Sequence, residues 1–279
     1  MSITVNTNTT SLMVQRNLES ATSSLAKSMQ RLSTGMRIND AGDDAAGLSL
    51  SEKIMSQVSS ADVTKNNAQT GLNMLQIADG DLSIIAENLQ RIKDLAVQSA
   101  NGVYATSERE SIDQEVQLRL QEIDRIATSS SFSELKLLDG SLSGTGKCTL
   151  QIGAGSDVDE NTIDISDAFG KADCASLGLD GQNVTTVDDA RAMIDAIDAA
   201  ITGVTDRRGV IGASMNRLNS TMDRIDIRKE NLQSSYSIIR DTDIAKESTE
   251  LTKQQVLQQS SATLLQQANQ TPTIALTLV

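Results

Sequence analysis

The sequence contains no histidine and no tryptophan, and it has only one proline among 279 residues. Without histidine the chain lacks the commonest general base and the commonest ligand of transition metals. Aromatic residues make up 1% of the chain, so a buried core must be built from aliphatic side chains and alanine. The scarcity of proline and aromatic residues favours long aliphatic helices over a β-sandwich or a barrel.

The charge is one-sided, because 37 acidic residues outnumber 24 basic ones and give a formal net charge of -13. A chain without surplus cations is a poor nucleic-acid binder. No apolar run is long enough to span a membrane, which takes about 18 residues or more. The first residues have neither the basic start nor the apolar stretch of a cleaved signal peptide. Taken alone, these features point to a cytoplasmic protein.

Heptad spacing is the strongest pattern in the sequence. Apolar residues recur in steps of four and three from Ala190 to Ile239, which is typical of helices packed as a coiled coil. The same steps predict a helix from near Asp43 or Asp44 to Asn101–Gly102, and another from about Ser107. The stripe of the last long helix is Ala190, Ile194, Ile197, Ile201, Val204, Arg208, Ile211, Met215, Leu218, Met222, Ile225, Lys229, Leu232, Tyr236 and Ile239. The two earlier stripes are Leu75, Ala78, Leu82, Ile85, Leu89, Ile92 and Ala96, and then Ile112, Val116, Leu120, Ile123 and Ala127.

Each end of the chain carries a weaker helical pattern. The first stripe is Leu18, Leu25, Met29, Leu32 and Met36, and the last is Leu257, Ser261, Leu264 and Ala268. Glutamine and serine flank the last stripe, so that helix is expected to be marginal alone in water.

The middle of the chain changes composition, since Gly140–Asn183 is rich in glycine, serine, threonine and aspartate. Thr149–Ile152 and Thr162–Ile165 read as strands around the polar turn Gly153–Asn161, which predicts a β-hairpin in a small surface excursion. The predicted fold is therefore mainly α. It is a long rod of heptad-patterned helices in a coiled-coil bundle, with a small mid-chain β-hairpin and with N- and C-terminal helices that pair.

Two short stretches imitate ligand-binding loops. Gly144–Lys147 resembles part of a phosphate loop, but Ser141 and Cys148 stand where that motif needs glycine and a hydroxyl residue. Asp157–Asn161 starts like a calcium loop, but Thr162 and Ala168 replace its glycine and its bidentate glutamate. We therefore predict no catalytic, cofactor or metal site, and an enzyme is the least favoured class.

Cys148 and Cys174 are the only cysteines. Their spacing does not suit zinc, and no histidine is available to complete such a site. Two readings stay open: a disulfide that staples the middle segment, or two separate, partly buried thiols.

Several sequence blocks together resemble the bacterial flagellin family. They are Leu32–Asn39 (LSTGMRIN), Asp43–Gly47 (DDAAG), Gln90–Asn101 (QRIKDLAVQSAN), Arg240–Ala245 (RDTDIA) and Leu264–Gln270 (LLQQANQ). The blocks occur in the family's order, and the resemblance covers roughly 1–165 and 186–279. It implies a structural subunit that self-assembles into the flagellar filament used for motility.

The resemblance also implies a division of the chain. Segments 1–40 and 240–279 would pair as the inner-tube coiled coil, while 41–139 and 186–239 would supply the helices of the rod domain. The hairpin and a short surface excursion would occupy 140–185, which leaves no room for a variable outer domain.

Flagellins leave the cell unfolded through the type III export apparatus, without a cleaved signal peptide, and polymerise at the filament tip. The resemblance thus replaces the cytoplasmic expectation with an extracellular one, at the bacterial flagellum. It implies an export chaperone, a cap and hook-associated proteins as partners, and no cofactor.

In many flagellins the segment matching Gln90–Gln98 is recognised by a vertebrate toll-like receptor. The matching residues here are Arg91 and Leu95, with Glu115 on the next helix. The alternative is that these side chains only pack subunits. Among rival classes, a hook–filament junction protein ranks second and a cytoplasmic signalling coiled-coil hairpin third.

Overall fold

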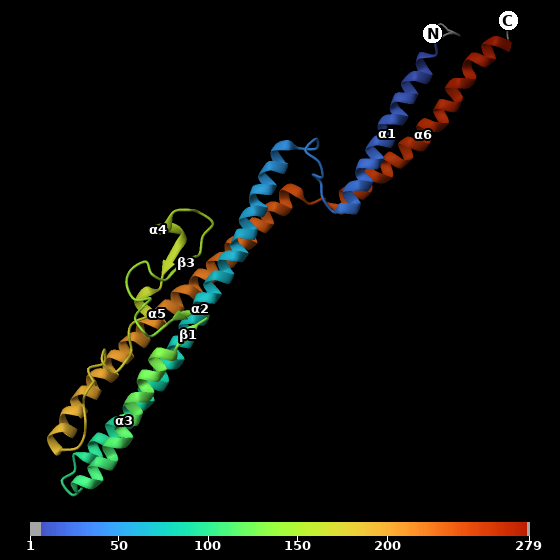
Figure 1. Cartoon of the computed structure of the whole chain (residues 1–279). Coiled ribbons are helices and arrows are strands. Elements are labelled where there is room, and N and C mark those ends of the chain that lie inside the picture. The colour runs from blue at the N-terminus through green and yellow to red at the C-terminus, as the bar shows by residue number, and fades with distance from the viewer. Residues whose placement is uncertain (1–6, 278–279) are drawn as a thin grey trace. The chain divides into compact units, whose positions relative to one another are not determined.

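The computed structural model describes residues 7–277, with side chains for residues 7–270. The chain forms two compact units: unit 1 lies within residues 1–56 and 230–279, and unit 2 within residues 57–229 (Figure 1). Helices α2 (Ala45–Ser99) and α5 (Val187–Arg240) each contribute to both units.

Unit 2 is built on the antiparallel pair α2 and α5, with α3 (Thr106–Ser129) lying alongside α2 (Figure 1). The three predicted long helices are confirmed, and their ends fall within two residues of the expected positions wherever one was predicted. On α2, every member of the stripe from Leu75 to Ala96 is fully buried. On α5, every seventh residue from Ala190 to Ile225 is buried, and the stripe positions between them are half-buried. The buried α5 positions are Ala190, Ile197, Val204, Ile211, Leu218 and Ile225.

Ion pairs with α2 explain why two members of the α5 stripe are charged. Arg208 Nε lies 2.8 Å from Asp79 Oδ1, and Lys229 Nζ lies 2.5 Å from Asp62 Oδ1, both on α2. Each cation stands at a half-buried position, so its aliphatic stem covers the seam while its charge is paired at the edge.

The middle segment forms the predicted hairpin. Strands β3 (Thr149–Gln151) and β4 (Thr162–Asp164) pair antiparallel, with Leu150 opposite Ile163. The connecting turn contains one helical turn, α4 (Val158–Asn161), and a short 3-10 helix, Ser166–Ala168, follows β4.

Segment 140–185, which is expected to form the hairpin and a short surface excursion, also contributes to the interior of unit 2. The segment inserts its own apolar side chains into the main core of unit 2. Phe169 and Leu179 are fully buried there, and Ile165 is almost so. This contribution to the core cannot be recognised in the sequence. The segment has no regular helix or strand over most of its length, so its buried residues do not recur at a fixed spacing. A second small hairpin, β1 (Ser131–Phe132) with β2 (Leu135–Lys136), was also missed.

Unit 1 contains α1 (Thr9–Thr34) and α6 (Ile244–Thr277), which pair antiparallel as expected for the terminal helices. Asn8 caps α1 by accepting a hydrogen bond from the Ser11 amide at 3.0 Å. Gly35 ends α1 with φ of 72°, a left-handed conformation that glycine adopts without strain. The unit is larger than the predicted segments 1–40 and 240–279, since it also takes in the first turns of α2 and the last turns of α5.

Candidate assembly surface

The seam between α1 and α6 mixes aliphatic residues with small and polar ones. Ala21, Leu25 and Ser28 are the buried residues of α1, where Val14, Leu18 and Leu32 are half-buried. Among the α6 side chains that the structure describes, up to residue 270, Ala268 is the buried one. Half-buried α6 positions continue the seam in steps of three and four: Glu247, Leu251, Gln254, Gln258, Ser261 and Leu265. Most of the described seam residues of α6 are small or polar, so α6 contributes less buried apolar area to the pair than α1 does.

Side-chain hydrogen bonds set the register of this pair. Asn8 Nδ2 donates to the Ala268 carbonyl at 2.8 Å, and the Ser11 hydroxyl donates to Asn269 Oδ1 at 2.7 Å. Farther along, Gln258 Nε2 donates to Thr22 Oγ1 at 3.1 Å. Polar contacts of this kind favour one alignment over others without adding much stability.

Several large apolar side chains of α1 and α6 point away from the seam. Leu257 is 44% exposed and Leu264 51% exposed, although the sequence pattern placed both on the pairing stripe of α6. Ser261 and Ala268 of that stripe do face α1, whereas Met29 of the α1 stripe is half exposed. Other exposed apolar residues of the unit include Leu12, Met13, Ile244 and Val256. These exposed apolar side chains are available for contact with a partner.

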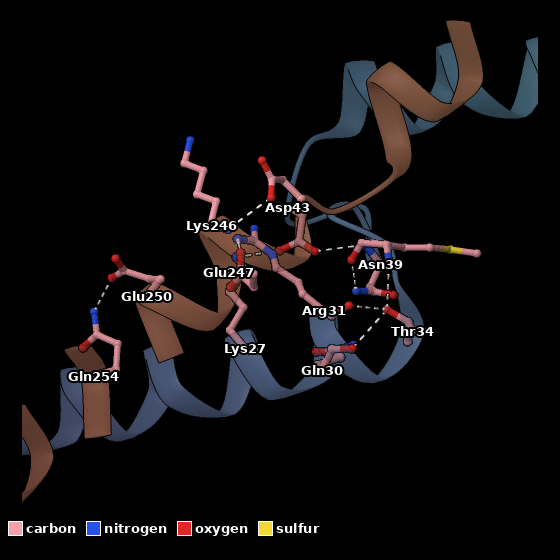
Figure 2. A network of polar contacts seen from close by, with 12 residues as sticks. Lys27, Gln30, Arg31, Thr34, Asn39, Asp43, Lys246, Glu247, Glu250 and Gln254 are labelled. Atoms are coloured by element: carbon pink, nitrogen blue, oxygen red, sulfur yellow. Dashed lines mark hydrogen bonds and ion pairs between the residues drawn. The ribbon is translucent and has the colours of Figure 1, made fainter. Parts of the chain in front are cut away.

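A polar network anchors the loop between α1 and α2 (Figure 2). Asp43 Oδ1 lies 2.5 Å from Lys27 Nζ, and Asp43 Oδ2 accepts the Asn39 amide at 3.1 Å. The Lys27 ammonium, followed by the Asn39 and Asp40 amides, lowers the pKa of Asp43 to about 2. Arg31 reaches Glu247 of α6 at 3.7 Å, so the same turn of α1 also holds α6.

The two breaks between helices also bind each other. The Arg37 amide donates to the Arg240 carbonyl at 2.6 Å, and the Thr242 amide donates to the Gly35 carbonyl at 2.9 Å. Arg240 in turn pairs with Glu52 at 2.5 Å. These contacts link the loop after α1 to the loop before α6 and fix where the helix pair of unit 1 begins.

The structure brings together two of the three residues proposed for receptor recognition. Arg91 on α2 and Glu115 on α3 form an ion pair at 3.1 Å, and both side chains are about half exposed. Leu95 is only 3% exposed and belongs to the core of unit 2. The charged pair is therefore exposed to solvent, whereas Leu95 is buried.

Both cysteines are free and buried, so the structure contains separate thiols rather than the disulfide that the sequence left open. Cys174 Sγ donates to the Leu120 carbonyl at 3.3 Å. Burial raises the pKa of the Cys174 thiol to about 12, and burial also raises the pKa of Cys148.

In the two stretches that resemble ligand-binding loops, polar groups form hydrogen bonds within the chain. The Gly146 amide, in the stretch resembling a phosphate loop, donates to Asp164 Oδ2 at 2.7 Å. Asp157 accepts the Asp159 amide at 3.0 Å and so caps α4. Within the described residues, no group of three potential ligands among cysteine, aspartate and glutamate is placed to hold a metal ion. None of the described helices has the length and apolar character to cross a membrane.

Long packed helices, with apolar side chains exposed on the terminal pair, are typical of a structural protein. Comparison with known families agrees with this class. Residues 5–143 match the bacterial flagellin N-terminal helical region, and residues 194–279 match the C-terminal helical region.

Known relatives match along the whole length. The chain is 37% identical to the flagellar filament 33 kDa core protein of Treponema phagedenis, over 99% of both chains. It is 37% identical to a flagellin of Halalkalibacterium halodurans, also over 99% of both. A crystal structure of Bacillus cereus flagellin is 29% identical, covers 57% of this chain and 88% of that one, and gives a TM-score of 0.48. The chain belongs to the bacterial flagellin family.

Family membership makes the chain a structural subunit of the flagellar filament, and it does not favour the junction-protein or signalling-hairpin alternatives. It also agrees with the expectation of a structural protein rather than an enzyme, and with an extracellular site of action.

Proposed function

We propose that α1 and α6 carry the contacts through which this flagellin polymerises, and that neighbouring copies cover their exposed apolar side chains. The observation that supports this proposal is the arrangement of α6, with glutamines and a serine among its seam residues and with Leu257 and Leu264 outside. Such a pair gains further apolar burial when other chains pack on it, so its ordering and polymerisation are coupled.

Deletion of Gln254–Val279 tests this coupling in the whole chain. We expect the shortened chain to keep the helices of unit 2, as judged by far-ultraviolet circular dichroism, but not to extend filament seeds under the electron microscope. Intact filaments from the deletion variant would refute the proposal.

A milder variant separates loss of surface from loss of structure. Leu257→Gln with Leu264→Gln removes exposed apolar surface from α6, while Val103→Gln removes it from the loop after α2, where Val103 is 85% exposed. We expect the α6 variant to grow slowly on seeds and the Val103 variant to grow normally. Equal growth of both would show that the α6 surface is not an assembly contact.

Export of the unfolded chain through the type III apparatus, without a cleaved signal peptide, is a second part of the proposal. It includes an export chaperone, the filament cap and hook-associated proteins as partners. Family membership supports it, and the intact mass of subunits taken from native filaments tests it. Loss of an N-terminal segment larger than Met1 would contradict export without cleavage.

Recognition by a toll-like receptor is supported by the exposed Arg91–Glu115 pair. Reporter cells exposed to monomer should respond, and Arg91→Ala should weaken the response. The control is Arg125→Ala, which removes a similarly exposed arginine paired with Glu122 on α3. Silence of the unmodified monomer at high dose would end the recognition proposal.

A further inference from the structure

The loop between α2 and α3 contains the only asparagine–glycine pair in the sequence, Asn101–Gly102. Both residues are exposed, and they follow α2, which ends at Ser99. An asparagine in this position can react with its own main chain, because the amide nitrogen of the next residue can attack the carbonyl carbon of the side chain. Glycine favours this approach, since it has no Cβ and adopts a wide range of backbone angles.

The attacking nitrogen is unobstructed. Within the part of the chain that the structure describes, no hydrogen bond occupies the Gly102 amide, whereas the amides of Asn101 and Val103 both donate. A Cβ built at Gly102 would meet nothing within 4 Å, so no neighbouring side chain crowds the position. The Gly102 nitrogen is therefore exposed to water and able to act as a nucleophile.

Both carbonyl groups of Asn101 accept hydrogen bonds. The Val103 amide donates to Asn101 Oδ1 at 3.2 Å, which polarises the side-chain carbonyl that the Gly102 nitrogen attacks. Arg109 Nη2 donates to the main-chain carbonyl of Asn101 at 3.1 Å, and Arg109 Nε donates to the Ser99 carbonyl at 3.0 Å. These two hydrogen bonds hold the guanidinium group beside the main chain of the reacting residue.

We propose that Asn101 is a site of spontaneous deamidation, at which the chain cyclises with loss of ammonia and then opens by hydrolysis. The Gly102 nitrogen bonds to Asn101 Cγ, and its proton passes through water to the departing Nδ2, which leaves as ammonia. Water then breaks one of the two bonds between the imide nitrogen and a carbonyl carbon. The reaction needs no oxidant or reductant, and it replaces a neutral amide by a carboxylate.

Arg109 favours one of the two products. Cleavage at Cγ gives aspartate, whereas cleavage at the main-chain carbonyl carbon gives isoaspartate, in which the main chain runs through Cγ. The guanidinium donates to the main-chain carbonyl oxygen, so it activates the carbon whose hydrolysis gives isoaspartate. It then pairs with the carboxylate that forms at that carbon. Isoaspartate is therefore the expected main product at residue 101.

Peptide mapping by mass spectrometry can follow the conversion in the folded, full-length monomer at neutral pH. Asn219 is the internal control, because it is exposed but is followed by serine within α5, where main-chain amides donate within the helix. We expect Asn101 to convert about tenfold faster than Asn219 or more, and Gly102→Ala to slow it by a similar factor, since a Cβ restricts the backbone. The added methyl group meets nothing within 4 Å, so this variant should fold normally.

A second pair of variants tests the arginine. Arg109→Gln should lower the ratio of isoaspartate to aspartate at residue 101 by about twofold or more, because the charged donor is lost. Arg125→Gln removes an exposed arginine of the same helix, α3, that pairs with Glu122, and it should leave the ratio unchanged. Electron-transfer fragmentation distinguishes the two isomers, and circular dichroism checks that both variants keep their helices.

Equal rates at Asn101 and Asn219 would overturn the proposed site, as would a rate at Asn101 that Gly102→Ala does not lower. An unchanged product ratio in Arg109→Gln, or an equal change in Arg125→Gln, would overturn the role assigned to Arg109. Deamidation needs no neighbouring copy of the chain, so these outcomes are independent of the proposed assembly function.

Discussion

At the scale of single residues, burial controls the chemistry of the two cysteines. Cys148 and Cys174 are free, buried, and have raised pKa values, so the reactive thiolate is scarce near neutral pH. In an extracellular protein, burial of such thiols slows their oxidation, so they stay reduced without forming a disulfide.

The first prediction concerns these thiols. Without reductant, the folded monomer should react very slowly with a thiol reagent at pH 8, and the protein in denaturant should show two free thiols. Absorbance of the released reporter gives the count. Absence of free thiols after denaturation would establish a disulfide instead.

The carboxylate of Asp43 gives a pH prediction for unit 1. Its pKa is lowered from 3.8 to about 2, so its contribution to stability is present above pH 4 and is lost as the pH falls towards 2. Asp43→Asn should therefore lower the melting temperature at pH 7 and flatten the acid-dependent loss between pH 4 and pH 2. Asp40→Asn, at an exposed neighbour, is the control. Parallel pH profiles for the unmodified chain and Asp43→Asn would contradict the assignment.

At the scale of elements, the hairpin depends on a glycine of α2. A Cβ at Gly71 would overlap the Leu150 side chain, whereas a Cβ at Gly80 meets nothing within 4 Å. The absence of a side chain at Gly71 is thus needed for the hairpin to pack on α2. At Gly80 nothing needs the space, and the glycine only lowers the stability of the helix.

This difference predicts opposite effects of one substitution at two sites. Gly71→Ala should destabilise the chain by about 1–2 kcal/mol, because the hairpin must shift. Gly80→Ala should stabilise it by about 0.5–1 kcal/mol. Urea unfolding of both variants measures these changes, and stabilisation by Gly71→Ala would show that Leu150 moves aside freely.

The α2–α5 seam carries the second element-scale prediction. Leu218 is fully buried at a heptad position, so Leu218→Asp would bury an unpaired charge and cost about 4 kcal/mol or more. Circular dichroism should show large loss of helix at 25 °C. Asn219→Asp, at the exposed neighbouring position, should retain the native signal.

At the scale of the whole molecule, the two units differ in what holds them together. Unit 2 has a continuous core of fully buried aliphatic residues, to which α2, α3, α5 and the middle segment all contribute. The α1–α6 pair of unit 1 has a seam that mixes aliphatic residues with small and polar ones, and it leaves other apolar side chains exposed. The units should therefore differ in local stability within one chain.

Hydrogen exchange should report this difference. In the monomer, amides of α1 and α6 should exchange faster than amides of the buried part of α2, by about tenfold or more. In filaments, the α1 and α6 amides should become protected, because neighbouring copies bury them. Equal protection of these helices in monomer and filament would argue against coupling between ordering and assembly.

The sequence by itself determined the helices, their approximate ends, the β3–β4 hairpin and the family. Heptad spacing from Ala190 to Ile239 can be read directly from the order of residues. Residues seven positions apart lie on the same face of a helix, so the spacing needs no knowledge of the partner helix. Turn residues and glycine marked the breaks in the same local way.

Only the tertiary structure decided which residues face which partner. It paired Arg208 and Lys229 with aspartates of α2, buried Phe169 in the core, kept the cysteines apart as free thiols, and turned Leu257 and Leu264 outward. The physical reason is that burial depends on contacts between segments far apart in the chain. Near-equal stripes, such as the two possible faces of α6, are distinguished only by the helix that packs against them.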